Sequence, residues 1–186
     1  MNFNKHYALE GKHAFLSASK YSWVRYDSTK VKAAYLNAQA QEHGTRLHKL
    51  ASDMIKNNVK AAKSKKTFNS FVNDAIGYRM ESEQILYYSP VCFGTADAIM
   101  FDEKTRMLRI FDLKTGITPA HVEQLMIYAA LFCLEYNYNP ESIDFDLRIY
   151  QSDEIIHVDC SAEDIRDIMN KIRDFSEILE KMGDNI

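Results

Sequence analysis

Two neighbouring segments of the sequence carry acids and a lysine in a pattern that could support phosphodiester hydrolysis. The first segment contains Asp97, and the second contains Asp112 and Lys114. Carboxylate oxygens are the ligands that Mg²⁺ and Mn²⁺ prefer over softer donors. Such an ion stabilises negative charge on a phosphate, and a nearby ammonium group can stand beside the attacking water. Taken alone, an acid–x–lysine tripeptide is more often an ordinary surface pair, so the second acid matters.

The spacing of the two acids predicts that they meet. Residues 91–101 and 107–113 are rich in β-branched and aromatic residues, and 102–106 is a plausible hairpin turn between two strands. In a hairpin centred between residues 104 and 105, Asp97 and Asp112 lie roughly opposite each other. Two carboxylates at this range repel, and burial raises the cost. A divalent cation between them removes the conflict.

Three further residues are candidate members of the same site. His48 lies on an apolar helix, where a lone histidine is more often a core residue, yet imidazole is a reasonable extra ligand for Mn²⁺. Gln124 and Tyr128 stand one helical turn apart and share a ridge. Either they mark the wet edge of a core helix, or they face the sheet and hydrogen-bond the lysine, the water or a phosphate. Glu81 and Glu83 precede the first predicted strand, and neither is expected to be a ligand.

The apolar pattern predicts the elements that position these residues. Expected helices cover residues 21–25, 29–57 with an interruption near Gly44, 68–76, 119–136 and a last segment capped by Ser161; expected strands cover 85–88, 91–101, 107–113, 143–150 and 154–158. This order predicts an α/β fold in which helices flank a central mixed β-sheet of about five strands.

Two of these elements carry predicted faces. The last helix has a capping box of Ser161 and Asp164. Its expected buried stripe is Ile165, Ile168, Met169, Ile172, Phe175 and Leu179. In the strand at 143–150, the alternating residues Asp144, Asp146, Arg148 and Tyr150 are expected to form a wet face.

Composition sets the class of protein. The chain has 186 residues, 46% of them apolar and 26% charged, which predicts one globular domain over residues 1–186. It has no run of about 18 apolar residues and no apolar stretch at its start, so we expect neither a membrane helix nor a signal peptide. The separated cysteines Cys92, Cys133 and Cys160 predict buried, reduced thiols in a cytoplasmic protein, with no zinc or iron–sulfur centre.

One short basic segment stands out against a net charge of −3. It contains Lys56, Lys60, Lys63, Lys65 and Lys66. Such a run is usually a solvated helix end and loop. It could also form one wall of a groove that binds the phosphates of nucleic acid.

The set His48, Asp97, Asp112-x-Lys114 and Gln124-x-x-x-Tyr128, in this order, resembles the PD-(D/E)xK nuclease superfamily. The similar branch is that of RecB-type nuclease domains and lambda-type phage exonucleases, whose leucine–serine–alanine–serine opening resembles residues 15–19. Ala96 replaces the proline of the name-giving pair.

The resemblance implies a restriction-endonuclease-like core and metal-dependent hydrolysis of DNA. Asp97, Asp112 and the Leu113 carbonyl would bind Mg²⁺ or Mn²⁺, with His48 as an accessory ligand. Lys114 would activate water or stabilise the transition state. Gln124 and Tyr128 would position these groups.

The expected function is therefore a deoxyribonuclease, most simply an exonuclease of DNA recombination or repair that is phage or prophage encoded. The resemblance implies DNA as a partner, together with either further copies of the chain or a recombination protein. Two alternatives stay open: a catalytically inactive nucleic-acid-binding module of the same fold, and a structure-specific endonuclease.

Overall fold

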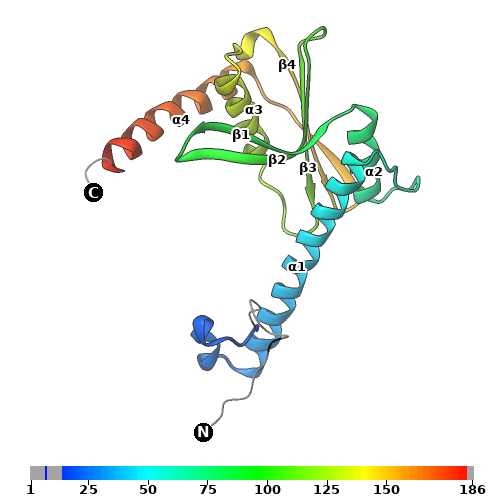
Figure 1. Cartoon of the computed structure of the whole chain (residues 1–186), viewed down its shortest axis with the longest axis vertical. Helices are drawn as coiled ribbons and strands as arrows, with labels where there is room; N and C mark the ends of the chain where they lie inside the picture. Colours follow the sequence, from blue (N-terminus) through cyan, green and yellow to red (C-terminus); the bar gives the residue numbers. More distant parts are fainter. Residues whose placement is uncertain (1–6, 8–13, 184–186) are drawn as a thin grey trace. The chain divides into compact units, whose positions relative to one another are not determined.

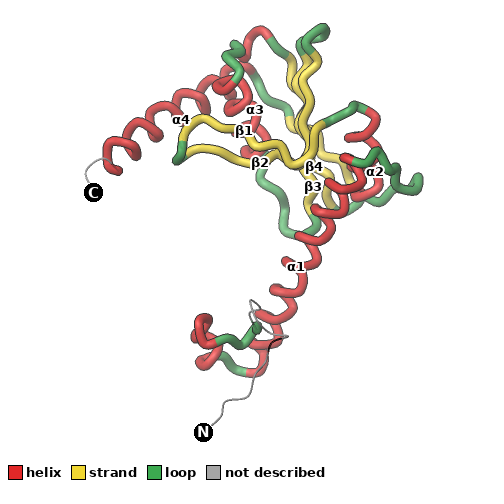
Figure 2. Tube along the Cα trace, in the orientation of Figure 1, coloured by secondary structure: helices red, strands yellow, loops and turns green. Residues whose placement is uncertain are grey.

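The computed structural model describes Tyr7 and residues 14–183 (Figures 1 and 2). The chain divides into two compact units, Met1–Thr45 and Arg46–Ile186. The expectation of one domain stays a prediction. All of the candidate site residues lie in the second unit.

The first unit contains a 3₁₀ helix, η2, at Ala18–Arg25, and the beginning of α1, which spans Ser28–Lys56. Residues 15 and 16 form a turn before η2, and residues 18 and 19 are its first two residues. The predicted interruption of α1 at Gly44 is wrong, because the helix continues through it. A single glycine costs a helix only about 1 kcal/mol relative to alanine, so a helix of this length tolerates it.

The second unit is built on a five-stranded mixed sheet. Its strands are β1 (Glu81–Ser89), β2 (Cys92–Asp102), β3 (Met107–Lys114), β4 (Asp144–Gln151) and β5 (Glu154–Val158), in that spatial order. β3 and β4 pair in parallel, and the other neighbours are antiparallel. The predicted α/β class and mixed sheet of five strands are thus confirmed. The predicted hairpin register is confirmed as well, since Ala98 pairs with Phe111.

Helices cover both faces of the sheet and create two cores. On one face, α3 (Glu123–Glu135) and α4 (Ala162–Gly183) pack over a core that includes Leu108, Ile110 and Ile149. On the other face, α2 (Thr67–Gly77) and the last turns of α1 pack over Phe111 and Leu113. A short 3₁₀ helix, η3, at Pro140–Ser142 precedes β4. The two faces of β3 therefore face different helices, which determines what Asp112 and Lys114 can reach.

Helix α3 begins later than predicted, at Glu123 instead of near Pro119. The amide of Gln151, at the end of β4, explains this difference. Its Nε2 donates to the carbonyls of Gly116 and Thr118, and its Oε1 accepts from the backbone of Ala120. These bonds hold the segment after β3 as a loop.

Helix α4 confirms its predicted cap and corrects its predicted stripe. Ser161 and Asp164 exchange hydrogen bonds as a capping box. The first turns of the stripe are buried, but Phe175 is 60% exposed and Leu179 is 47% exposed. Figure 1 shows the last turns of α4 running out towards the C-terminus, past the body of the sheet.

The predicted wet face of β4 is also wrong. Tyr150 is fully buried, and the side chains of Asp146 and Arg148 are 16% and 17% exposed. Helix α2 covers this face, and a tyrosine–aspartate hydrogen bond of 2.7 Å links Tyr150 to Asp74 of α2. Alternation of residue types identified the strand but not the cover over its polar side.

The three cysteines form no disulfide. Cys133 is buried as expected, whereas Cys92 and Cys160 are only partly buried. Burial raises the pKa of the Cys133 thiol to about 12. Within the described residues, no helix combines the length and apolar character needed to span a bilayer.

Candidate metal and catalytic site

The site lies where β2 and β3 separate. Their pairing extends from the hairpin turn to Ala98 and Phe111. Beyond that pair, β2 continues with β1 as a two-stranded ribbon, while β3 continues with β4 (Figure 2). The side chain of Asp97 replaces the missing backbone partner, because its Oδ2 accepts a 2.8 Å hydrogen bond from the Leu113 N–H. We call this opening the fork.

Three side chains converge at the fork on a volume that suits a metal ion. His48, Glu83 and Asp97 each offer a ligand atom, and these atoms lie within 4.8 Å of one another. His48 Nδ1 is 3.3 Å from Asp97 Oδ2. Two carboxylates and an imidazole form a donor set suited to Mn²⁺ and compatible with Mg²⁺.

A buried contact between α1 and β1 brings these groups together. Ser52 stands one helical turn after His48, and Ser82 directly precedes Glu83. The two serine hydroxyls are 2.9 Å apart and buried. This contact fixes the helix against the strand, and the two neighbouring ligands are fixed with it.

Glu83 has an unusual backbone. Its φ is 55°, the left-handed region that a non-glycine residue seldom adopts. Such a conformation costs about 1–3 kcal/mol and is concentrated at functional sites. Glu83 follows Ser82, which pairs with Ala98, the last residue of β2 that also pairs with β3.

Asp112 and Lys114 lie on the β3 arm of the fork. Asp112 is only 3% exposed. Lys114 Nζ lies 3.2 Å from Asp112 Oδ1, with which it hydrogen-bonds, and 3.0 Å from Oδ2. Among the described residues, buried Oδ2 accepts no hydrogen bond of good geometry. A buried carboxylate oxygen in this state retains capacity to bind a cation.

Helix α3 links the two arms. Gln124 Oε1 accepts a 2.7 Å hydrogen bond from Lys114 Nζ on β3, and Gln124 Nε2 lies 3.2 Å from the Tyr128 hydroxyl, to which it donates. The Tyr128 ring packs against Gly94 on β2, where an added Cβ would come within 2.9 Å of ring atom Cε1. Gly94 therefore provides the space for Tyr128. The predicted ridge of Gln124 and Tyr128 does face the sheet.

The electrostatics of the fork show that its acids are coupled. Burial, and then repulsion from Asp97, raise the pKa of Asp112, while Lys114 opposes the shift. Burial and repulsion from Asp97 likewise raise the pKa of Glu83. The hydrogen bond that His48 donates to Asp97 is the largest influence on His48 and raises its pKa; burial opposes the shift, and Asp112 and Glu83 add smaller support. Burial is thus the main cause of both acid shifts, and repulsion between the carboxylates adds to it.

The fork brings together most of the predicted residues and adds one. His48, Asp97, Asp112 and Lys114 lie in one electrostatically coupled group, and Lys114 contacts the Gln124–Tyr128 pair. The Leu113 N–H donates a hydrogen bond to Asp97 at this site, whereas the role of the Leu113 carbonyl as a metal ligand stays a prediction. Glu83 lies within β1 and not before it, in the group that could hold a metal; the expectation that it is no ligand stays a prediction. Its sequence signal was an acid at the position that pairing places opposite Asp97.

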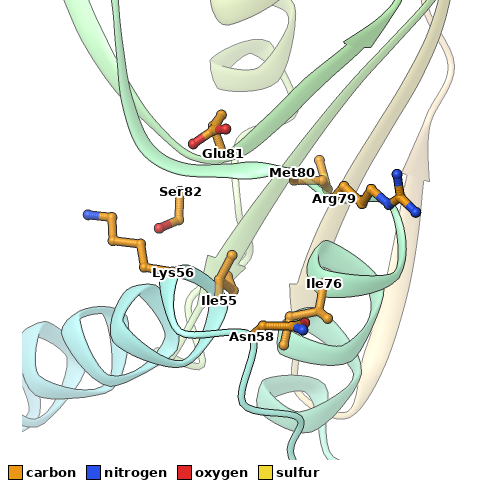
Figure 3. Close-up of a pocket in the computed structure, with 8 residues that line it drawn as sticks. All are labelled: Ile55, Lys56, Asn58, Ile76, Arg79, Met80, Glu81 and Ser82. Carbon is orange, nitrogen blue, oxygen red and sulfur yellow. The ribbon is translucent and has the colours of Figure 1, made fainter.

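The predicted basic wall is only partly connected to the fork. Lys56 lies at the end of α1, and the other four lysines, at 60, 63, 65 and 66, are exposed on the segment that leads to α2. Lys56 lines a pocket of about 410 Å³ next to Glu83, and its charge lowers the pKa of that acid. In Figure 3, Lys56 and Glu81 lie on one side of this pocket, and the guanidinium of Arg79 points away from them. Nucleic-acid binding by the lysines stays a prediction.

The residues present fit a divalent cation. A cation held by His48, Glu83 and Asp97 would relieve the repulsion between Glu83 and Asp97. Asp112 does not belong to this group of three, and its predicted role as a ligand stays a prediction. Comparisons of the chain with protein-family models, curated proteins and solved structures give no match.

Proposed function

We propose that this protein is a Mg²⁺- or Mn²⁺-dependent nuclease that hydrolyses phosphodiester bonds of DNA. The excess of carboxylates at the fork carries the proposal: Glu83, Asp97 and Asp112 share a site whose fixed cation is Lys114, with His48 as the titratable neighbour. A structural cluster would balance its charges. An excess of buried acid beside a lysine suits a metal that in turn binds phosphate.

Four side chains would hold the metal: His48, Glu83, Asp97 and Asp112. When bound, the ion would stabilise developing charge on the phosphate and lower the pKa of a coordinated water. The protein itself supplies the ligand geometry. Asp97 is fixed by the Leu113 N–H, and His48 and Glu83 are fixed through the Ser52–Ser82 contact.

Lys114 is the residue placed to act on the reacting groups. Its ammonium has three donors, and the described residues supply two partners, Asp112 and Gln124. The third donor can reach a phosphate oxygen or the attacking water. Gln124 is a positioning residue in this scheme, since it holds the ammonium and is itself oriented by Tyr128.

The finer proposal is that the enzyme is an exonuclease of DNA recombination or repair, of phage or prophage origin. It rests on the order of motifs that resembles RecB-type and lambda-type nucleases. Lys56, beside the pocket next to Glu83, is the basic residue best placed to contact a flanking phosphate.

End-labelled linear duplex DNA with Mg²⁺ or Mn²⁺ tests the proposal. We expect degradation that EDTA stops, and a loss of about 10²–10³-fold or more in rate for Asp112→Ala and for Lys114→Ala. Glu103→Gln and Lys104→Ala are matched controls, because both residues are exposed on the turn at the far end of the same two strands. Circular dichroism verifies folding of each variant.

The outcomes separate the alternatives. Cleavage of linear but not covalently closed circular DNA supports the exonuclease, and cleavage of both supports an endonuclease. DNA binding without metal-dependent cleavage indicates the inactive binding module. Full activity in both fork variants would remove the assignment.

A further inference from the structure

The C-terminal half of α4 carries an exposed apolar ridge. Phe175 is 60% exposed, Ile178 55%, Leu179 47% and Met182 61%. Large apolar side chains scattered singly on a surface are normal, but four within three helical turns form a continuous patch. This patch lies outside the nuclease site.

The ridge continues a regular seam. Apolar residues of α4 recur at alternating spacings of three and four, at Ile165, Ile168, Ile172, Phe175, Leu179 and Met182. This heptad spacing is typical of a helix that packs along its length against another helix. Ile165 and Ile172 are buried in the protein's own core, whereas the last three positions are exposed. The first half of this row of apolar residues therefore packs in the protein's own core, and the second half is exposed.

A groove lies beside the ridge. It has a volume of about 430 Å³ and lies between α4, α3 and the tip of the β1–β2 ribbon. It is lined mostly by apolar residues, among them Val91, Cys92, Ile127, Ile168 and Ile172, with Phe175 and Leu179 on its α4 side. One surface therefore offers both a ridge and a hollow.

We propose that this surface binds a second copy of the chain, with the α4 ridge of each protomer seated against the groove of its partner. A two-fold interface needs a patch that is complementary to itself. A ridge and a groove side by side meet that need, and two identical heptad seams match in spacing.

The area available agrees with a stable homodimer. A large apolar side chain presents roughly 150–250 Å² when fully accessible. The ridge and the exposed groove residues Val91 and Ile127, at 48% and 41%, together offer on the order of 500 Å². A standard interface buries about 800 Å² per partner, and in homodimers about 65% of it is apolar. The two areas correspond.

Charge does not oppose the pairing. Ser176, beside Phe175 in the seam, is uncharged, and the two charged residues that line the groove, Glu123 and Lys171, have opposite signs. The net charge of −3 is small, so two copies repel only weakly at physiological salt.

Sedimentation equilibrium of the full chain, from about 1 to 100 μM, tests the proposal. We expect a mass of twice 21.5 kDa at the higher concentrations. Phe175→Glu and Leu179→Glu each place a charge in the seam and should raise the dimer dissociation constant at least 100-fold. The matched control is Phe93→Glu, because Phe93 is 62% exposed and stacks on Tyr87 outside the groove.

A monomer at 100 μM overturns the proposal, as does a trimer or larger ring. A dimer that survives Leu179→Glu, or that Phe93→Glu disrupts equally, overturns it too. None of these readouts depends on nuclease activity, so the dimer and the proposed function fail or stand separately.

Discussion

Two clusters of charged side chains pack against the same sheet, and only one of them is balanced. The balanced cluster lies under α2 and pairs two acids with two arginines: Asp74, Asp146, Arg109 and Arg148. Arg148 donates to both Asp146 oxygens, at 2.7 and 2.8 Å. Both guanidinium groups also lie over the Tyr78 ring, at 4.5 and 5.5 Å.

The fork has the opposite arrangement. Glu83, Asp97 and Asp112 outnumber Lys114, and burial with mutual repulsion raises the pKa of two of the three acids. Buried charge is costly, so a cluster that only supported the fold would be expected to resemble the one under α2. The contrast supports the proposal that the fork binds a metal, and three variants test it.

The largest effect is expected in the balanced cluster. Arg148→Ala removes the bidentate partner of Asp146 and leaves Arg109, 3.3 Å away, as its remaining ion-pair partner. Breaking a buried pair costs about 3–5 kcal/mol, and we expect a loss at the lower end of that range because Arg109 remains. Urea unfolding measures the loss. A cost below about 1 kcal/mol would mean that the cluster is as solvated as a surface pair, and the contrast with the fork would disappear.

The fork should respond in the opposite direction. Asp112→Asn removes a buried charge whose ionised form is disfavoured, so we expect the metal-free protein to gain about 1–2 kcal/mol. Differential unfolding in EDTA measures this change. A clear loss of stability would show that the Asp112–Lys114 ion pair supports the fold.

A third variant tests the link between the arms. Gly94→Ala places a Cβ 2.9 Å from the Tyr128 ring, and relief of that clash should cost about 1–3 kcal/mol and lower cleavage severalfold by displacing Gln124. Gly77→Ala is the control, because no atom lies within 4 Å of its added Cβ. Equal cleavage rates in both variants would remove the positioning role of Tyr128.

The fold was largely predictable because local patterns decided it. Turn residues at 102–106 fixed the hairpin register, and Ser161 with Asp164 fixed the start of α4. The errors concern what covers an element. Phe175 was expected to be buried, and the polar face of β4 was expected to be wet. The residue spacing within a helix or strand does not show which other element packs against it or how far that element extends.

The site was predictable where the chain is contiguous. Asp97, Asp112 and Lys114 followed from one hairpin, and Gln124 with Tyr128 from one helical turn. Glu83 was considered and not expected to be a ligand, because its place beside Asp97 depends on β1 pairing with β2 and on the Ser52–Ser82 contact across 30 residues of sequence. Gly94 within a strand was an available signal for the close approach of Tyr128.

Calorimetric titration of Mn²⁺ into the metal-free protein measures whether the fork binds a divalent metal ion. The unbalanced acids predict saturable binding, and Glu83→Gln and Asp97→Asn should each weaken it at least tenfold, while Glu103→Gln leaves it unchanged. Absence of binding heat at millimolar Mn²⁺, or equal affinity in the two fork variants and the wild-type protein, would contradict the account.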